Sequence, residues 1–304
     1  MRTQTLETLQ RIARLGSFSL AAEEANMTLS SVSMQMKALE EELGAELFDR
    51  ASRPPRLTPL GRRVAEQAGN VLHEDHVLRE LCSVGTGLAG TFRLGVISSY
   101  ATRLIPKFLQ MAPMNAPGAE FDVSTGLSSD LCASVLSGRL DAAVVTRAGR
   151  EDPLLRFDTM GRDPMVLALP KGARGETLRQ LADELRFLHF QPLSGIGRVI
   201  ADTLAKHKID VRRARIFDSI ETTMECVNIG IGFTLLPEPD VKRYAAADVK
   251  ILQPKIGLVE REVALVTRIE PSAERWRGAL LDMLATTERL AQGEQKRTVG
   301  HKDG

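Results

Sequence analysis

The stretch GSFSLAAEEANMTLSSVSMQMKALEEEL, from Gly16 to Leu43, predicts two short helices joined by a tight turn. Ser17 can cap the first helix, and Asn26 can adopt the left-handed backbone conformation that ends it. Thr28 is a second capping residue, and it opens a helix for which Gly44 is the stop signal. Two short helices separated by about three residues have the dimensions of a helix-turn-helix.

The residues on either side of this stretch add a helix and a basic loop. From Thr5 the apolar residues follow the three-and-four spacing of an amphipathic helix, which Gly16 closes. Leu47–Phe48 and Arg56–Leu57 predict two short strands around a loop whose two prolines exclude helix. From residue 50 to residue 63 there are five arginines and no acidic residue, namely Arg50, Arg53, Arg56, Arg62 and Arg63. The loop is therefore predicted to be a wing, with a polyanion as a plausible partner.

A long helix is predicted from Pro59 to about Cys82, because proline suits a first helical turn and one apolar stripe follows. The stripe consists of Leu60, Val64, Ala68, Val71, Leu72, Leu78 and Leu81. Such a stripe on a helix between two domains is either core or a coiled-coil seam, and we favour a dimer seam. Gly85, Gly87 and Gly90 then indicate a hinge-like linker.

Beyond Thr91 strands alternate with helices, which predicts βαβ units and a parallel sheet. The expected strands are 92–97, 121–125, 141–146, 165–169, 187–190, 215–217, 231–236 and a returning strand at 262–267. The expected helices are 101–111, 131–136, 197–206, 220–229 and a closing helix from Ser272 to about Leu290. The fold class is therefore α/β with an all-α, winged helix-turn-helix N-terminal domain. The residues from Gly293 to Gly304 lack apolar periodicity and are expected to be disordered.

The composition fits a globular protein of about two domains. Of the 304 residues, 43% are hydrophobic, 26% are charged and only 4% are aromatic, which excludes the disordered and fibrous classes. No apolar run approaches the roughly 20 residues of a membrane span, and the first residues lack the apolar stretch of a signal peptide. We therefore expect a cytoplasmic protein without a membrane partner. Cys82, Cys132 and Cys226 show no disulfide or zinc spacing, so buried free thiols are expected.

The N-terminal segment resembles the signature of the LysR-type transcriptional regulators. The matching residues are Gly16-Ser17-Phe18-Ser19, Ala21-Ala22, Val32-Ser33, Gln35, Leu39-Glu40, Leu43-Gly44, Leu47-Phe48, Arg50 and Leu57-Thr58-Pro59-Leu60-Gly61. The resemblance implies a DNA-binding regulator that is a homodimer through the linker helix and commonly a homotetramer. It also implies a two-lobed effector domain like the periplasmic-binding-protein fold. Double-stranded DNA and a small-molecule effector are the expected partners, RNA polymerase is a candidate partner, and no cofactor or metal is expected.

The domain boundaries follow from these segments. We expect the winged helix-turn-helix at 1–58, the linker helix and hinge at 59–90, the effector domain at 91–292 and a tail at 293–304. Within the effector domain, lobe I is expected at about 91–161 and 268–292, and lobe II at about 162–267.

The N-terminal part of the second helix of a helix-turn-helix enters the major groove. The candidate DNA contacts on it are Thr28, Leu29, Ser30, Ser31, Ser33, Met34 and Lys37, to which the wing adds Arg50, Arg53 and Arg56. Members of the family usually carry polar residues where Leu29 and Met34 stand. These two side chains either touch thymine methyl groups or leave selectivity to DNA shape while Lys37 and the wing contact phosphates; we favour the second option.

Ligands of open α/β sheets bind beyond the carboxyl ends of the strands. The residues expected there are polar: Ser98, Ser99, Tyr100, Thr125, Ser128, Ser129, Thr146, Arg147, Gln191, Ser194, Gly195 and Thr234. They suit a small polar or anionic effector with Arg147 as its counter-charge. The alternative is that the serines are helix caps.

Three other functions fit the sequence less well than an effector-controlled DNA-binding regulator. An enzyme is disfavoured because no catalytic motif occurs and the five histidines form no constellation. A redox-responsive regulator using Cys226 lacks a second cysteine in that lobe. A free solute-binding protein conflicts with the DNA-binding segment.

Overall fold

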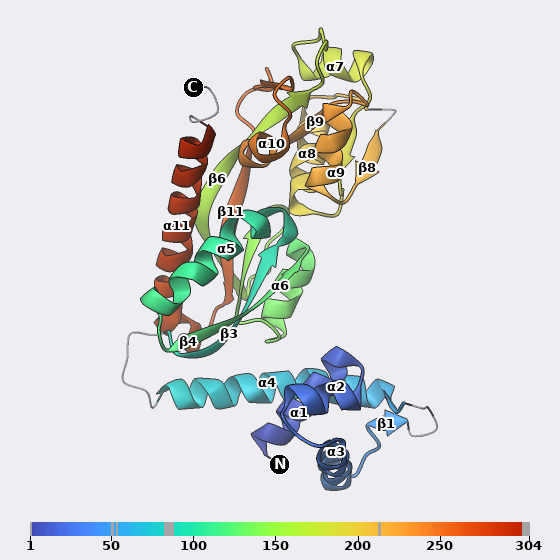
Figure 1. Cartoon of the computed structure of the whole chain (residues 1–304), viewed down its shortest axis with the longest axis vertical. Helices are drawn as coiled ribbons and strands as arrows, with labels where there is room; N and C mark the ends of the chain where they lie inside the picture. The colour runs from blue at the N-terminus through green and yellow to red at the C-terminus, as the bar shows by residue number, and fades with distance from the viewer. Residues whose placement is uncertain (1, 50–51, 53, 82–87, 212–213, 300–304) are drawn as a thin grey trace. The chain divides into compact units, whose positions relative to one another are not determined.

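The computed structural model describes residues 2–49, 52, 54–81, 88–211 and 214–299 of the chain (Figure 1). Within these ranges the side chains of residues 73, 76–77, 79–81 and 292–299 are not described. The chain forms two compact units, one built mainly from Met1–Gly85 and the other mainly from Thr86 onward. Each unit is considered by itself.

Three helices with well-defined ends form the first unit, α1 (Thr3–Leu15), α2 (Phe18–Glu24) and α3 (Leu29–Leu43). The Ser17 hydroxyl accepts from the backbone N–H of Leu20, as expected of a cap. Gly16 and Gly44 end α1 and α3 with φ of 64° and 62°, and Asn26 has a φ of 52°. These are the left-handed positions that the sequence predicts.

The wing strands β1 (Phe48–Asp49) and β2 (Arg56–Leu57) pair antiparallel, and α4 (Pro59–Leu81) follows. Gly61 lets the start of α4 approach β1, since a Cβ there would overlap the carbonyl oxygen of Leu47. The apolar stripe of α4 is divided. Val64, Ala68 and Leu72 belong to the hydrophobic core of this unit, whereas Leu60, Val71 and Leu78 are exposed.

The second unit is organised around one sheet with the strand order β10-β6-β11-β5-β3-β4, in which β9 also pairs with β6. Its parallel part is β3 (Gly90–Ile97), β4 (Ala119–Gly126) and β5 (Ala142–Thr146). The long strands β6 (Leu155–Leu169) and β11 (Glu260–Arg268) are antiparallel to each other, and β11 is antiparallel to β5. β9 (Thr234–Pro237) and β10 (Lys250–Leu252) complete the sheet.

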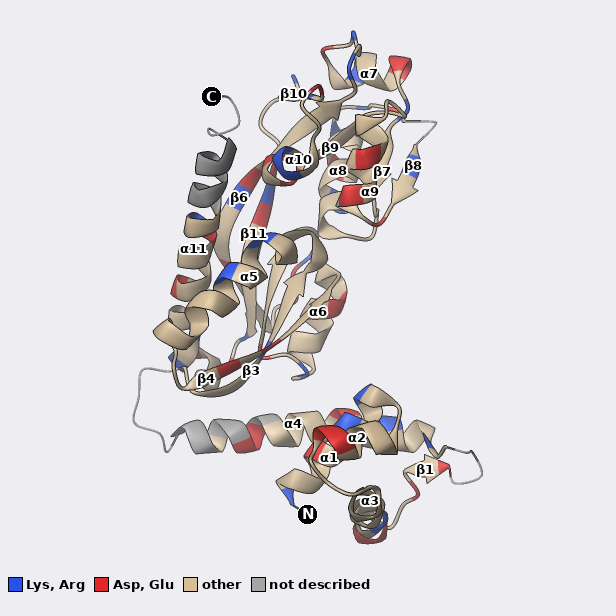
Figure 2. Cartoon of the chain, viewed as in Figure 1, with Lys and Arg blue, Asp and Glu red and all other residues tan. Residues whose placement is uncertain are grey.

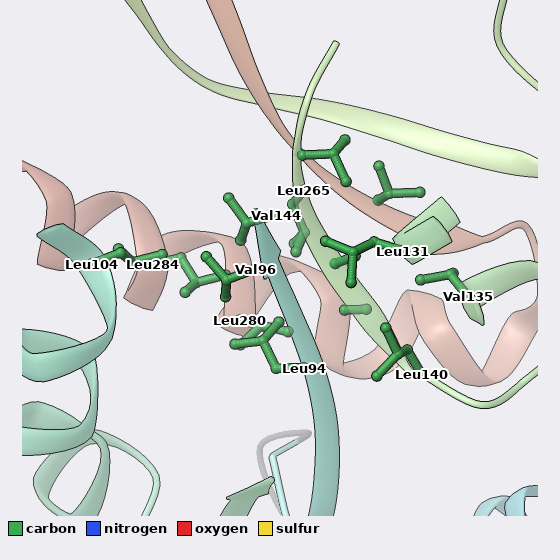
Figure 3. Close-up of a cluster of buried hydrophobic side chains, with 14 of the residues drawn as sticks. Leu94, Val96, Leu104, Leu131, Val135, Leu140, Val144, Leu265, Leu280 and Leu284 are labelled. Carbon is green, nitrogen blue, oxygen red and sulfur yellow. The ribbon is translucent and has the colours of Figure 1, made fainter. Parts of the chain in front are cut away.

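A first hydrophobic core fills the space around β3 and β5 (Figure 3). It contains Leu94, Val96 and Val144 from the strands and Leu265 from β11. The helices α5 (Ser98–Asn115), α6 (Ser128–Leu136) and α11 (Pro271–Val299) cover it, and α5 packs against α11.

A second hydrophobic core lies around the C-terminal half of β6, with Met165, Leu167 and Phe233 among its members. The parallel pair β7 (Leu188–Phe190) and β8 (Arg215–Phe217) belongs to this part of the unit. So do the helices α7 (Leu178–Glu184), α8 (Gly195–Lys206), α9 (Ile220–Asn228) and α10 (Glu238–Tyr244). Because β6 and β11 run along both cores, they connect two lobes within one unit.

The sequence-based expectation of a parallel sheet is correct only for part of the unit. β11 returns antiparallel, β6 begins ten residues earlier than expected at Leu155, and β10, α7 and α10 were not predicted. The C-terminal expectation also needs correction, because α11 continues to Val299, past the start of the predicted tail at Gly293. Most of those residues are good helix formers, so a helix continues without an apolar stripe; the rest of the tail lies outside the described residues.

Candidate functional site

The helix α3 presents a polar face that begins at its N-cap. The Thr28 hydroxyl accepts from the backbone N–H of Ser31 at 3.2 Å and lies 2.9 and 2.8 Å from the hydroxyls of Ser30 and Ser31. Ser30 and Ser33 are exposed, whereas Val32, Met36 and Leu39 point into the core. The first turn of α3 therefore leaves the hydroxyl-bearing residues Thr28 and Ser30 at the surface of the unit.

Two apolar side chains lie on this same surface. Leu29 is 50% exposed and Met34 is 71% exposed, so neither contributes substantially to the core of the unit. Lys37 is exposed and lies 3.7 Å from Glu41, one turn later. An exposed ion pair of this type is worth little, which leaves the ammonium group available to another partner.

The wing is attached to α3 by a carboxylate. Glu40 Oε1 accepts from the backbone N–H groups of Leu47 and Phe48 at 2.8 and 3.0 Å. Arg56 is exposed on β2, whereas Arg50 and Arg53 lie outside the described residues. The Glu40 contact fixes the wing relative to α3, and sequence reasoning did not assign it this role.

The predicted effector residues at the start of α5 have three different environments. Ser98 is exposed and Ser99 is half-buried, with its hydroxyl accepting from Arg261 Nη1 at 3.2 Å. Tyr100 is fully buried, and Arg103 stacks 4.2 Å from the centre of its ring. Burial raises the pKa of the Tyr100 hydroxyl well above its ordinary value, so Tyr100 is a neutral interior residue.

The next group lies at the ends of β4 and β5. Thr125 and Ser129 are exposed, and the Ser128 hydroxyl accepts from the backbone N–H of Thr146 at 3.2 Å. Thr146 itself is buried. The structure therefore brings Ser128 and Thr146 together, as expected for neighbouring strand ends.

Arg147 is the predicted counter-charge, and carboxylates already surround it. Its guanidinium donates to Glu151 and, at 3.0 Å, to Glu262. The hydrogen bond to Glu151 has the larger effect and the one to Glu262 the next, and both raise the pKa of Arg147 above its ordinary value. The Arg147 charge is thus largely compensated within the protein.

The residues at the start of α8 are mainly structural in their contacts. The Ser194 hydroxyl accepts from the N–H of Gly197 and donates to the carbonyl of Gln191, as a helix cap does. Gly195 lies directly against Thr146, because a Cβ there would overlap the threonine side chain. Thr234 is fully buried and its hydroxyl donates to Leu188 O at 2.7 Å.

A cation that the sequence analysis did not select lies beside these residues. Arg198 is exposed on the first turn of α8, and its Nη1 is 3.1 Å from the position that a Cβ of Gly149 would occupy. Gly149 belongs to the loop after β5, so Arg198 reaches from the second lobe to the first. The described residues provide no carboxylate within ion-pair distance of it. The sequence analysis did not select Arg198 because it lies within the predicted helix 197–206, one residue after its start, rather than at the end of a strand.

Five buried charged residues lie where β6 and β11 pass from the first core to the second: Arg103, Asp163, Asp240, Arg261 and Glu288. We call them the hinge cluster. Asp163 and Arg261 are register partners on β6 and β11, and Figure 2 shows charges of both signs on these two strands. None of the five was predicted, since charged residues in a sequence indicate surface unless their partners are known.

Neither a metal site nor a redox pair is found in the described part of the chain. Its His, Cys, Asp and Glu residues form no group that could hold a metal ion. Cys132 belongs to the first core and Cys226 to the second, and burial raises the pKa of the Cys132 thiol to about 11. Among the described helices none is long and apolar enough to cross a bilayer.

Comparison with known proteins gives two family matches. Residues 3–62 match the family described as "Bacterial regulatory helix-turn-helix protein, lysR family". Residues 85–285, about two thirds of the chain, match the family described as "LysR substrate binding domain". The two matches together cover both units of the structure.

Curated relatives are regulators of transcription. The chain is 28% identical over 303 residues to the DNA-binding transcriptional dual regulator OxyR of Escherichia coli, covering 92% of this chain and 96% of the relative. It is 25% identical over 247 residues to the HTH-type transcriptional regulator CzcR of Bacillus cereus, covering 81% and 84%.

Solved structures share the fold. A full-length OxyR variant from Pseudomonas aeruginosa superposes with a TM-score of 0.71 at 23% identity, over 95% of each chain. Full-length CbnR in complex with its target DNA has a TM-score of 0.65 at 17% identity, over 93% of this chain and 100% of that chain. The α/β fold with an N-terminal helix-turn-helix and a two-lobed second domain is therefore shared with full-length regulators.

Proposed function

The chain belongs to the LysR family of bacterial transcriptional regulators, and from this premise we propose that a small-molecule effector in its second domain controls how it binds a specific double-stranded DNA. The observation that carries the DNA-binding half is the exposed first turn of α3, together with the wing that Glu40 holds near the other end of this helix. Its exposed hydroxyls and Lys37 suit a groove lined with phosphates. The cytoplasm, where the DNA is, is the proposed location.

For DNA recognition we propose Thr28, Ser30, Ser31, Ser33 and Lys37 on α3, and Arg50, Arg53 and Arg56 in the wing. Lys37 and the wing arginines would contact phosphates, which adds affinity without sequence information. Leu29 and Met34 are exposed enough to meet thymine methyl groups. Because leucine has no hydrogen-bonding group and the methionine sulfur is only a weak acceptor, we favour DNA shape as the main source of selectivity.

Gel-shift titration of the full chain on the DNA upstream of its gene tests this half. We expect Lys37→Ala and Arg56→Ala each to weaken binding and to reduce the slope of log affinity against log salt by about one. Lys171→Ala is the matched control, since Lys171 is a well-exposed lysine of the second domain. Equal affinity for the target and for competitor DNA at every salt concentration would contradict sequence-specific binding.

For the effector we propose a site between the start of α5, the ends of β4 and β5 and the start of α8. Ser98, Ser99, Thr125, Ser128, Ser129 and Gln191 are the proposed polar contacts. Tyr100, Thr146, Ser194, Gly195 and Thr234 would shape the site from behind, because they are buried and their contacts lie within the protein. Arg198 rather than Arg147 is the proposed counter-charge, since Glu151 and Glu262 already pair with Arg147.

A thermal-shift screen of small carboxylates, with inorganic phosphate as a further probe, tests the effector proposal. A ligand that stabilises the protein is expected to lose most of its effect in Arg198→Gln and to keep it in Arg174→Gln, an exposed control. Equal stabilisation of both variants would contradict the assignment of Arg198.

The proposed function also includes an oligomeric state and a set of domain boundaries. We propose a homodimer through α4, whose exposed Leu60, Val71 and Leu78 support a coiled-coil seam, and a homotetramer formed from two such dimers. The proposed segments remain 1–58, 59–90 and an effector domain from 91. RNA polymerase is a further proposed partner. Light scattering that gives a monomer at micromolar concentration would contradict this assembly.

A further inference from the structure

The hinge cluster is held together unevenly. Asp163 Oδ2 accepts from Arg103 Nη2 at 2.8 Å and from Arg261 Nε and Nη2 at 3.1 and 2.5 Å. Asp240 Oδ2, in contrast, lies 3.5 Å from Arg261 Nη2 and has no hydrogen-bond partner among the described residues. The carboxylate on β6 is therefore saturated, and the one on α10 is not.

Donors are also left over. Nε and Nη1 of Arg103 are buried, and no acceptor in the described part of the chain takes them. The Arg103 side chain is only 4% exposed and these two nitrogens are buried, so water outside the protein does not satisfy them. Buried polar atoms without partners are unfavourable and uncommon in folded proteins. The cluster thus contains a surplus of donors at one residue and of acceptors at another.

These two residues belong to different lobes. Arg103 is on α5, where its neighbours Tyr100 and Leu104 are members of the first core. Asp240 is on α10, beside Val241 of the second core. Between the lobes run β6 and β11, whose pairing shifts register between Val263 and Ala264. A bulge of this kind bends the strand that carries it, so the two strands that join the lobes are irregular within three residues of Arg261.

The net charge of the hinge cluster is a further sign that Asp240 lacks a full partner. With every group ionised, the two arginines and three carboxylates leave one negative charge in excess. Burial raises the pKa of Asp240, although Arg261 on β11, Arg103 on α5 and Arg243 on α10 oppose this effect and Asp163 on β6 adds to it. Burial likewise raises the pKa of Glu288 on α11. In the arrangement seen here the Asp240 carboxyl therefore keeps its proton to a higher pH than an exposed aspartate does.

We propose that the hinge cluster is a latch with two positions, and that in the second position Nε and Nη1 of Arg103 donate to the ionised carboxylate of Asp240. Moving α10 toward α5 would form this ion pair between the lobes, and the Asp240 proton would pass to solvent. The pair would satisfy the surplus atoms of both residues and retain the bonds of Asp163 to Arg261. The latch itself needs no effector; only its consequence for DNA binding rests on the proposed function.

Interlobe distances in the full-length protein test the latch. Spin labels are placed at the exposed residues Asp122 on β4 and Asp183 on α7, in a chain whose three cysteines are changed to serine. The labelled protein is diluted with unlabelled protein, so that distances within one chain dominate. We expect two distance populations whose ratio changes at least about threefold across a pH series that starts near the ordinary aspartate pKa of about 4 and extends to alkaline pH. The population with paired Arg103 and Asp240 should grow as pH rises.

Asp240→Asn keeps the shape of the side chain but cannot ionise, so it should leave one population and no pH dependence. Asp141→Asn is the matched control: Asp141 is also a buried carboxylate, but it pairs with Arg93 within the first lobe, and both populations should persist. Arg103→Gln provides a second test if Asp240→Asn fails to fold. One wild-type population at every pH, or two in both latch variants, would overturn the proposal. Gel shifts on the same proteins distinguish failure of the latch from failure of the proposed function. If the interlobe distances change with pH but the affinity for DNA does not, the latch stands and only its proposed control of DNA binding is contradicted.

Discussion

At the scale of single residues, two glycines in helices provide a matched comparison. Gly61 begins α4 against the wing, where a Cβ would overlap the carbonyl oxygen of Leu47; Gly278 lies in α11, where a Cβ would meet nothing within 4 Å. The same substitution should therefore have opposite effects at the two positions.

We expect Gly61→Ala to lower the free energy of unfolding of the first unit by about 1–3 kcal/mol, because the backbone must move to accept the methyl group. Gly278→Ala should raise the stability of the second unit by up to about 1 kcal/mol through helix propensity. Urea unfolding of each variant measures both effects. Equal stability of Gly61→Ala and wild type would show that the start of α4 is less tightly packed than described.

Two aspartates of the hinge cluster should respond to pH with opposite signs. Burial raises the pKa of Asp240, so the folded protein holds a proton that the unfolded chain loses above about pH 4. The resulting stability is fully present below that pH and is lost as pH rises through the raised pKa. For Asp163, burial is outweighed by Arg261 and Arg103, which lower its pKa; its contribution is present above about pH 4 and is lost as pH falls through the lowered value.

Asp240→Asn should therefore flatten the decline of stability on the alkaline side of pH 4. Asp163→Asn should cost about 3–5 kcal/mol at neutral pH, because it strands two buried guanidiniums. Urea unfolding across a pH series distinguishes the variants. An unchanged alkaline slope in Asp240→Asn would mean that another group carries the proton.

At the scale of secondary-structure elements, the ends of helices were the most predictable feature. Thr28 caps α3 and Gly44 ends it, because capping hydroxyls and left-handed glycines act through neighbouring residues alone. The first half of β6 was not predictable in this way. Its sequence LRFDTMGRDP looks like a loop, and it becomes a strand because oppositely charged residues of β11 lie opposite, such as Arg162 to Glu262 and Asp163 to Arg261.

In the candidate effector site, too, the features that depend on neighbouring residues could be predicted, and those that depend on residues far apart in the chain could not. Ser128, Thr146 and Gly195 were selected from strand ends, and the structure brings them together. The pairing of Arg147 with Glu262 and the closeness of Arg198 to Gly149 depend on residues far apart in the chain. No spacing in the sequence reports such contacts.

Two helix-capping threonines allow an effect on stability to be distinguished from an effect on DNA binding. Thr28 caps α3, and Thr177 forms a capping box at the start of α7. Either threonine changed to alanine should cost about 1 kcal/mol in the stability of its own unit. Only Thr28→Ala should also weaken binding in the gel shift. Weakening by both variants to the same degree would argue against a direct role of Thr28 at the DNA.

At the scale of the whole molecule, the two described cysteines are free and pack against different cores, which does not suit a switch formed by the pair. The raised pKa of Cys132 also keeps its thiol protonated at neutral pH. We expect Cys132→Ser and Cys226→Ser to bind DNA as wild type does, with or without hydrogen peroxide. A peroxide-dependent loss of binding that Cys226→Ser abolishes would restore the redox-responsive alternative.

The shared strands β6 and β11 also govern the order in which the chain can fold during synthesis. The first core needs Leu265 from β11 and Trp276 from α11, which leave the ribosome long after Leu94 and Val96. At roughly 5–20 residues per second, the early strands wait many seconds with their apolar side chains uncovered. The nascent second domain is therefore a natural client for chaperones, whereas the N-terminal unit holds all of its own core residues and is free to fold first.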